Sequence, residues 1–256
     1  MTSERRVLVH PDAESLAASV AARFLTKVID LLDEHETIDV CLTGGTTGIA
    51  VLAAVAANPA REGIDWSRVA FWWGDERYVP RGDPDRNDKQ GHDALLDLLP
   101  VPEENLHPFP APGEHASIEE AADAYAAELG DTVFDITFLG VGSDGHIASL
   151  FPDHASVRET RRTVVAETDS PKPPSQRLSL TLPVINASER IWLILAGSDK
   201  AGALGLALAD ANVASVPVAG VRGRKRTVFF VDQAASAEVP EGLIDRDRYW
   251  TAKDEA

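Results

Sequence analysis

The sequence predicts an α/β fold, in which a mostly parallel sheet carries helices on both faces. Two observations support this prediction. Short apolar runs typical of buried strands recur along the chain, and each is followed by glycine or proline and then by a helical pattern. The length of 256 residues allows one large domain with a substantial core. We therefore interpret residues 1–256 as a single domain.

The expected strands are 7–10, 38–42, 69–73, 134–139, 191–195 and 227–231. After the first strand, Asp12 can cap a long helix in which Leu16, Val20, Phe24 and Val28 recur at helical spacing. Further helices are expected at about 46–57, 87–98, 117–129 and 200–209, the first three preceded or opened by Thr, Asn or Ser. Three stretches rich in Pro, Gly and charge are interpreted as long surface loops, namely 77–91, 100–115 and 167–177.

The charge balance limits the classes of partner. The chain has 24 Lys and Arg against 41 Asp and Glu, which gives a net charge of −17. Such a field repels phosphodiester backbones and anionic membrane surfaces, so we expect no nucleic-acid or membrane partner. A small anionic ligand would need Arg and Lys side chains concentrated at its site.

The cysteine content and the absence of targeting patterns suggest a compartment. Cys41 is the single cysteine, so an internal disulfide is impossible, and its apolar neighbours suggest a small buried side chain. No run reaches the roughly 18 apolar residues of a membrane span, and the first residues have no signal-peptide core. We expect a soluble cytoplasmic protein.

A glycine-rich turn follows the second expected strand. Gly44 and Gly45 leave backbone amides unshielded, and Thr46 and Thr47 add hydroxyl groups where a helix begins. Amides at a helix start favour a phosphate group. The Lys-Ser/Thr pair of a P-loop is absent. The alternative is a tight strand-to-helix turn with a threonine cap.

The third expected strand runs into a charged loop. Asp75, Glu76 and Arg77 occupy the strand tip, and Asn87 follows. An arginine held by neighbouring carboxylates can present a fixed fork to a phosphate or carboxylate group. The alternative is a solvated charge cluster on a surface loop.

The segment FDITFLGVGSDGHIASLFPD contains the first candidate for chemistry, His146. It follows a strand and a run of glycines, so it should lie at the carboxyl edge of the sheet, where ligands bind in open α/β folds. The formal G-x-G-x-x-G pattern of Gly140, Gly142 and Gly145 is rejected as a dinucleotide site, because Pro152 leaves no room for the helix that must follow. A structural histidine is the alternative.

Two further segments contribute cations. Lys172 and Arg177 lie in SPKPPSQRLSLTLPVIN, and Lys200 follows the strand 191–195 at the expected start of a helix. A cation there is unfavourable to the helix dipole unless an anion is also bound, which suggests a functional role. A metal site built from Asp144, His146, Asp153 and His154 is the weaker interpretation, because these residues match no familiar ligand spacing.

Taken together, these segments resemble the 6-phosphogluconolactonase family, which is related in fold to glucosamine-6-phosphate deaminases and ribose-5-phosphate isomerases and has a Rossmann-like sheet. The resemblance extends from about residue 38 to 231 through five blocks in family order: LTGGTTG, WWGDERYVPRGDPDRN, FDITFLGVGSDGHIASLFPD, SPKPPSQRLSLTLPVIN and LAGSDKAGAL. One departure lies in the first block, where the family more often has Gly-Gly-Ser-Thr-Pro. The hydroxyl groups of Thr46 and Thr47 are retained.

The resemblance implies hydrolysis of 6-phospho-D-glucono-1,5-lactone to 6-phosphogluconate, in the oxidative pentose phosphate pathway, without a metal or cofactor. It makes His146 the general base and gives Asp75 the task of orienting either the substrate or His146. Amides near Gly44, Gly45 or Gly142 would hold the oxyanion. The remaining substrate-binding candidates are Thr46, Thr47, Arg177 and Lys200 at the phosphate, with Arg77, Asn87, Asp144 and Lys172 as further contacts.

Two other functions remain open. The deaminase branch shares the Asp-Gly-His-Ile-Ala motif, but it carries a Glu five residues after the His, where this chain has Phe151. An apolar ring cannot relay a proton, so lactone hydrolysis is favoured over isomerisation with deamination. A catalytically silent sugar-phosphate sensor is the alternative from another class. We expect a monomer whose partner is its small-molecule substrate.

Overall fold

The computed structural model describes residues 4–246. Within this range most strands form one sheet of seven, the main sheet, in the order β1-β10-β9-β6-β2-β3-β5, and every pairing in it is parallel. Its strands are β1 (Glu4–His10), β2 (Ile38–Leu42), β3 (Val69–Trp73), β5 (Leu106–His107), β6 (Ile136–Gly140), β9 (Arg190–Leu195) and β10 (Arg226–Asp232). The parallel α/β prediction is confirmed.

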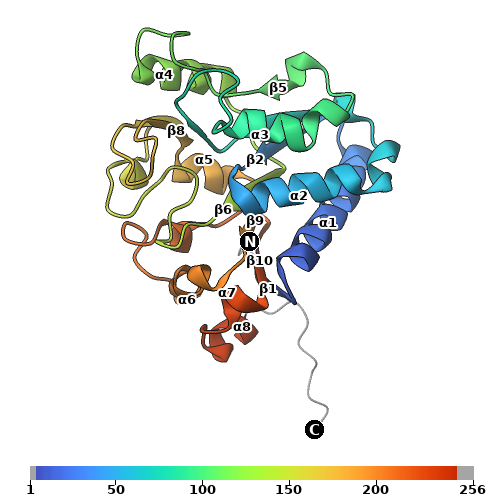
Figure 1. Ribbon diagram of the computed structural model, residues 1–256, viewed down its shortest axis with the longest axis vertical. Helices are drawn as coiled ribbons and strands as arrows, with labels where there is room; N and C mark the ends of the chain where they lie inside the picture. The colour runs from blue at the N-terminus through green and yellow to red at the C-terminus, as the bar shows by residue number, and fades with distance from the viewer. Residues whose placement is uncertain (1–3, 247–256) are drawn as a thin grey trace.

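The α-helices lie on both faces of the main sheet. They are α1 (Ala13–Glu34), α2 (Gly45–Ala57), α3 (Asn87–Ala94), α4 (Ile118–Leu129), α5 (Leu182–Ala187), α6 (Ala201–Leu208), α7 (Gln233–Ser236) and α8 (Glu241–Arg246). Figure 1 shows the strands in the middle, with α1 and α2 on the right and α5 and α6 on the left. No helix in residues 4–246 is long and apolar enough to span a membrane.

Local sequence explains how the long helices begin. Asp12 caps α1 by accepting a hydrogen bond from the Ser15 amide at 2.7 Å, and Ser117 caps α4 in the same way through the Glu120 amide at 3.2 Å. The apolar positions of α1 are buried against the sheet, including Val20, Phe24 and Val28. The expected helix 87–98 is shorter than predicted, because α3 ends at Ala94 and a 3-10 turn covers Leu96–Leu98.

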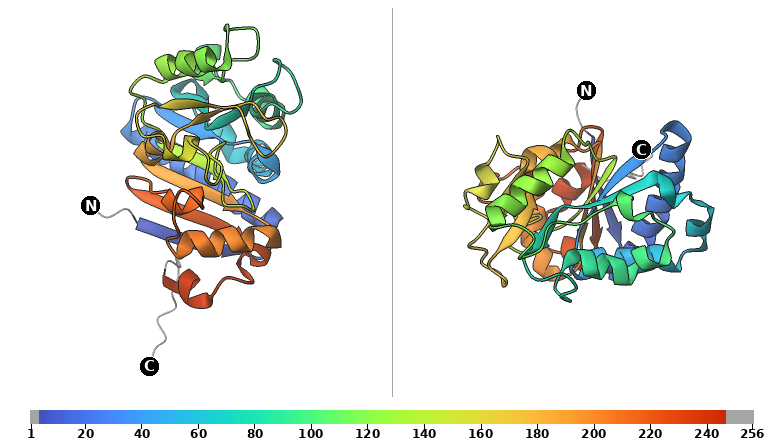
Figure 2. Two further views of the ribbon diagram at one scale, coloured as in Figure 1. Left: turned by 90° about the vertical axis from the view of Figure 1, so that its left-hand side faces the viewer. Right: turned by 90° about the horizontal axis from the view of Figure 1, so that it is seen from above.

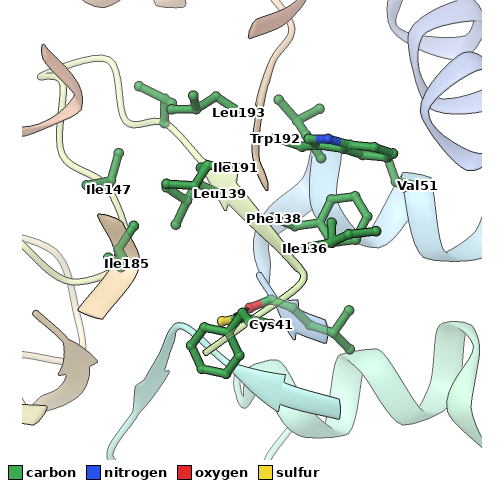
Figure 3. Packing of buried hydrophobic residues seen from close by; sticks show 14 of the residues in the cluster. Cys41, Val51, Ile136, Phe138, Leu139, Ile147, Ile185, Ile191, Trp192 and Leu193 are labelled. Carbon is green, nitrogen blue, oxygen red and sulfur yellow. Dashed lines mark hydrogen bonds between the residues drawn. The ribbon is translucent and has the colours of Figure 1, made fainter. Parts of the chain in front are cut away.

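Nearly all of the buried apolar side chains of residues 4–246 belong to one cluster, which runs from β1 to α8. Figure 3 shows how β6 contributes to both faces: Phe138 lies toward Trp192 and Val51 of α2, whereas Leu139 lies toward the other face. The Phe138 and Trp192 rings meet edge to face at 5.5 Å. Cys41 is fully buried, as predicted. A single core supports the one-domain interpretation of 1–256, whose first three and last ten residues lie outside the described range.

A second sheet was not predicted. In the described chain, β4 (Asp75–Arg77), β8 (Arg177–Leu180) and β7 (Val164–Glu167) form an antiparallel sheet, here called the small sheet. Two of the expected surface loops, 77–91 and 167–177, are therefore partly strand, and 87–94 is helical. The small sheet packs against α4 and brings residues 75–77 and 177–180 together.

At one edge of the main sheet, the first strand of the described chain pairs with the last. β1 pairs in parallel with β10 from Glu4 opposite Arg226 to His10 opposite Asp232, and β10 pairs on its other side with β9. Figure 2 (left) shows β1, in blue, beside β10, in red. β10 therefore separates β1 from the rest of the main sheet.

Candidate active site

A cavity of about 630 Å³ opens at the carboxyl ends of the main-sheet strands. Thr43 follows β2, Gly140 ends β6 and Asp232 ends β10, and all three line the cavity. The small sheet closes another side through Asp75, Arg77 and Arg177. This is the edge at which open α/β sheets bind ligands, because the loops leaving the strand tips surround a crevice.

The cavity brings together almost all of the predicted site residues. Its lining includes Gly44, Gly45, Thr46, Thr47, Asp75, Arg77, Asn87, Gly142, His146, Lys172, Arg177 and Lys200. Asp144 does not line it but contacts His146 from behind. Residues from five separate blocks of sequence thus meet in one place.

The glycine turn leads directly into α2. Gly44 is the N-cap and offers no side-chain cap, and Gly45 adopts φ +79°, a conformation that favours glycine. The first amides of α2 are therefore left without a side-chain acceptor beside the cavity. A Cβ on Gly44 would collide with the Asn87 side chain, so a glycine is needed for the close approach of α3. This arrangement suits an anion.

His146 is held by a carboxylate two residues away. Its Nδ1 lies 2.5 Å from Asp144 Oδ1, and the same oxygen accepts the His146 backbone N–H at 3.2 Å. An Nδ1–H donated to Asp144 leaves Nε2 with the lone pair needed to accept a proton. Burial raises the pKa of Asp144, but the hydrogen bonds and charge of His146 and the charge of Lys172 outweigh it and lower that pKa well below its usual value. Asp144 is therefore an ionised acceptor.

Lys172 completes this group. Its Nζ lies 3.3 Å from His146 Nδ1 and 4.0 Å from Asp144 Oδ1. The peptide bond between Pro173 and Pro174 is cis, and the backbone carbonyls of residues 172–174 accept hydrogen bonds from the Arg177 guanidinium. The loop that holds Lys172 is thus tied to the beginning of β8.

Asp75 does not contact His146, which excludes one of its two predicted roles, that of orienting the histidine. Its Oδ2 accepts a hydrogen bond from Ser149 Oγ at 2.6 Å, and Oδ1 accepts one from Asn87 Nδ2 at 3.3 Å. The carboxylate contact with His146 is made by Asp144 instead. Asp75 is 7 % exposed and lines the cavity, so a substrate contact is the role that remains.

Gly142 also differs from its predicted role as a donor to the oxyanion. Its amide donates to the His146 carbonyl at 2.9 Å and is not available to a substrate. A Cβ on Gly142 would overlap both His146 Nδ1 and Asp144 Oδ1. The glycine therefore makes room for the pair of side chains, and the proposed oxyanion donors reduce to amides near Gly44 and Gly45.

Replacing Gly142 by alanine is expected to lower kcat by roughly tenfold or more, because the added methyl group displaces the His146 ring from Asp144. The backbone of Gly142 has no positive φ, so the variant should fold. Steady-state kinetics and urea unfolding of the same preparation measure the two effects. Gly63→Ala is the control, because a Cβ there meets open space. A Gly142→Ala protein with normal kcat would contradict this role for the glycine.

Cations gather in the cavity despite the acidic composition. Arg77 and Arg177 face each other in the β4–β8 register, and Lys172 and Lys200 lie on the same lining. Like charges opposite each other on neighbouring strands are unfavourable unless an anion lies between them. Burial lowers the pKa of Arg177. The cavity therefore has the charge expected of a phosphate-binding site.

A buried ion network supports the small-sheet side of the cavity. Glu76, 0 % exposed, accepts hydrogen bonds from the amides of Arg77, Asn87 and Asp88 at 2.7–2.9 Å. Arg86, also 0 % exposed, donates to Asp88 and lies 3.8 Å from Glu76 Oε2. The predicted alternative of a solvated charge cluster is wrong for these residues. They fix the backbone that carries Arg77 and Asn87.

Sequence reasoning missed three residues of the site. Ser149 is fully buried and holds Asp75, Thr43 lines the cavity and accepts the Gly140 amide at 3.3 Å, and Asp232 accepts the Gly197 amide at 3.0 and 3.1 Å. Ser149 lies in the His146 block and Thr43 precedes Gly44, so adjacency to the motifs was a usable signal. Among residues 4–246, no group of three or more His, Cys, Asp or Glu is placed to hold a metal ion.

Comparison with known proteins identifies the family. The model of the family described as glucosamine-6-phosphate isomerases/6-phosphogluconolactonase matches residues 11–230. The 6-phosphogluconolactonase of Streptomyces coelicolor is 46 % identical over 95 % of this chain and 98 % of its own length. The chain belongs to the 6-phosphogluconolactonase family. A chloroplastic 6-phosphogluconolactonase 3 of Arabidopsis thaliana is 36 % identical over 92 % of this chain and 76 % of its own length.

Solved structures agree with this membership of the 6-phosphogluconolactonase family. The crystal structure of the Thermotoga maritima 6-phosphogluconolactonase superimposes with a TM-score of 0.80 at 29 % identity, covering 90 % of this chain and all of the other. A monomeric glucosamine-6-phosphate deaminase shares the fold, with a TM-score of 0.74 at 20 % identity. The predicted relation in fold between the two branches is confirmed.

Proposed function

We propose that this chain hydrolyses 6-phospho-D-glucono-1,5-lactone to 6-phosphogluconate with His146 as the general base. The observation that carries the proposal is the Asp144–His146 pair on the wall of a cavity that also holds four cations. The 6-phosphogluconolactonases of several bacteria and plants are its relatives. The reaction is one of carboxylic ester hydrolysis.

The chemistry follows from the hydrogen bonds of His146. Nδ1–H donated to Asp144 leaves Nε2 to take a proton from water as the water oxygen attacks the lactone carbonyl carbon. The carbonyl oxygen gains negative charge, and amides near Gly44 and Gly45 stabilise it. The bond from this carbon to the ring oxygen then breaks, and the imidazolium returns its proton to that oxygen. Water and lactone thus give the hydroxy acid.

The phosphate group needs a second set of contacts. The uncapped start of α2, with Thr46 and Thr47, offers amides and hydroxyl groups, and Arg177 and Lys200 offer charge. Lys200 is the N-cap residue of α6, where its cation is unfavourable to the helix dipole unless an anion is bound. Arg77, Asn87 and Lys172 remain candidates for contacts with the sugar.

Phe151 argues against the deaminase reaction. This residue is fully buried, and its ring lies 4.7 Å from the His146 ring and 5.8 Å from the Arg177 guanidinium carbon. It supports the catalytic histidine by packing and has no group that can carry a proton. We propose further that the chain acts as a monomer in the cytoplasm, without nucleic-acid partners, an expectation that rests on its composition.

The test is the rate of acid release from freshly prepared 6-phosphogluconolactone in weak buffer, compared with the spontaneous rate. We expect clear acceleration by the wild-type chain and no ammonia release from glucosamine 6-phosphate. Acceleration unaffected by a metal chelator would agree with a metal-free mechanism. A rate equal to the spontaneous one would refute the proposal, and ligand titration with 6-phosphogluconate would then test the sensor alternative.

A further inference from the structure

A second cavity, of about 540 Å³, lies between α1 and the strands β1, β10 and β9. It shares no lining residue with the active-site cavity. The residues that it takes from the strands include Arg190 and Arg226, which begin β9 and β10. The catalytic residues follow the carboxyl ends of the strands, so the two cavities lie toward opposite ends of the main sheet.

The second cavity is rich in cations. Its lining includes Arg6, Arg23, Lys27, Arg190 and Arg226, against the single carboxylate of Asp30. The Arg226–Arg190 register places two of the cations side by side on neighbouring strands. Neighbouring cations repel each other, and a bound anion would relieve that repulsion.

Two neighbouring carboxylates pair with three of these cations. Glu4 pairs with both Arg6 and Arg226, the latter at 2.6 Å, and Asp30 pairs with Lys27 at 2.6 Å. Glu189, the residue before Arg190, makes its closest ion pair with Lys225 at 2.8 Å.

Arg190 supplies a donor that the described residues leave unused. Its Nη1 is buried and has no hydrogen-bond partner among the described residues, although the charge of Arg190 does act on Glu189. A buried charged donor without an acceptor is costly, and a phosphate oxygen would satisfy it. The planar guanidinium suits phosphate through its fork of N–H groups.

The strand wall of the cavity also carries apolar side chains. Leu8, Trp192, Val228 and Phe230 line it from the same three strands. A ligand there meets charge near the starts of the strands and apolar side chains further along them. The combination fits a molecule with a phosphate group at one end and a less polar body at the other.

From these observations we propose that this cavity is a second ligand site, which binds a small phosphorylated molecule. Arg190 and Arg226 hold the phosphate, Lys27 and Arg23 of α1 contribute charge from the other wall, and the apolar wall receives the body of the ligand. The site is separate from lactone hydrolysis and needs none of the catalytic residues.

Calorimetric titration tests the proposal, with adenosine 5′-monophosphate, inorganic phosphate and adenosine as probes. At low ionic strength we expect the monophosphate to bind more tightly than inorganic phosphate, and adenosine not to bind. Raising the salt concentration should weaken both phosphate probes, because screening acts on the charge contacts. Absence of monophosphate binding, or equal binding of adenosine, would overturn the proposal.

Single-residue variants show which cavity binds the monophosphate. Arg190→Gln and Lys27→Gln should each weaken monophosphate binding, by at least about tenfold for Arg190→Gln and by less for Lys27→Gln, whose side chain is 32 % exposed. Lys27 lies on the surface of α1, so the Lys27→Gln protein should fold and keep normal lactone hydrolysis. Arg162→Gln, an exposed arginine paired with Asp123, is the matched control. Binding lost in Lys200→Gln but retained in Arg190→Gln would assign it to the active site and refute a second site.

Discussion

Replacing His146 by alanine is expected to lower kcat for lactone hydrolysis by at least about a hundredfold. The imidazole is the group whose Nε2 can take a proton from water, because Asp144 fixes the other ring nitrogen as a donor. Without it, the uncapped amides and the cations still bind and polarise the substrate, so KM should change much less than kcat. Acid release in weak buffer, corrected for the spontaneous reaction, gives both constants.

A second histidine on the same loop provides the control. His154 lies 5.7 Å from the Phe151 ring, on the side of Glu167, and does not line the cavity. His154→Ala should therefore retain kcat within a few fold. An undiminished kcat in His146→Ala would place the base elsewhere. Equal losses in both variants would indicate damage to the loop and not to the chemistry.

Replacing Arg86 by methionine is expected to lower the free energy of unfolding by about 3–5 kcal/mol. Arg86 is fully buried, and its removal takes the buried cation away from the carboxylates of Glu76 and Asp88, so that Asp88 keeps only the partly exposed Arg81 at 3.3 Å. It also removes donors to the carbonyls of Val79 and Phe109. Urea unfolding measures the loss.

The loss of stability in Arg86→Met should increase as the pH rises. Burial already raises the pKa of Glu76 to about 7, although the Arg86 charge lowers it. A carboxyl group with a raised pKa binds more protons in the folded state, so its contribution to stability falls as the pH rises above the unfolded value. Without Arg86 that pKa rises further. The deficit of Arg86→Met should therefore be larger at pH 8 than at pH 5.5.

Arg162→Met serves as the comparison for stability. Arg162 and Asp123 form an ion pair at 2.9 Å with both side chains more than half exposed. Exposed pairs contribute about 1 kcal/mol or less. A similar small loss in Arg86→Met would mean that the buried network does not stabilise the small sheet.

The main-sheet strands and the long helices could be predicted because their signals are local. Runs such as 38–42 and 69–73 are apolar and bounded by turn residues, and β2 and β3 match them residue for residue. The small sheet could not be found in this way. β4 is three charged residues long, and its partner β8 lies a hundred residues away, so neither periodicity nor apolar content marks the pairing.

The candidate site, like the fold, could be predicted from the sequence only in part. Sequence motifs identified residues that line the cavity, since most of them follow a strand of the main sheet. They did not distinguish Asp75 from Asp144 as the partner of His146, because that depends on which carboxylate the folded loop brings within 2.5 Å. Nor could composition show that Glu76 and Arg86 are buried. A charged residue at a strand tip can be exposed to water or covered by another chain segment, and its residue type does not distinguish the two.

The position of β10 has a consequence for how the chain is made. A ribosome releases β1 well before the strand that pairs with it, which lies some two hundred residues later and must enter between β1 and β9. Until then β1 lacks the strand that it pairs with in the folded chain. Lys200 precedes β10 and Asp232 ends it, so the cavity is completed in the same step. Biosynthetic assembly of this enzyme is therefore concluded by its C-terminal quarter, and a polypeptide arrested before residue 226 should have no activity.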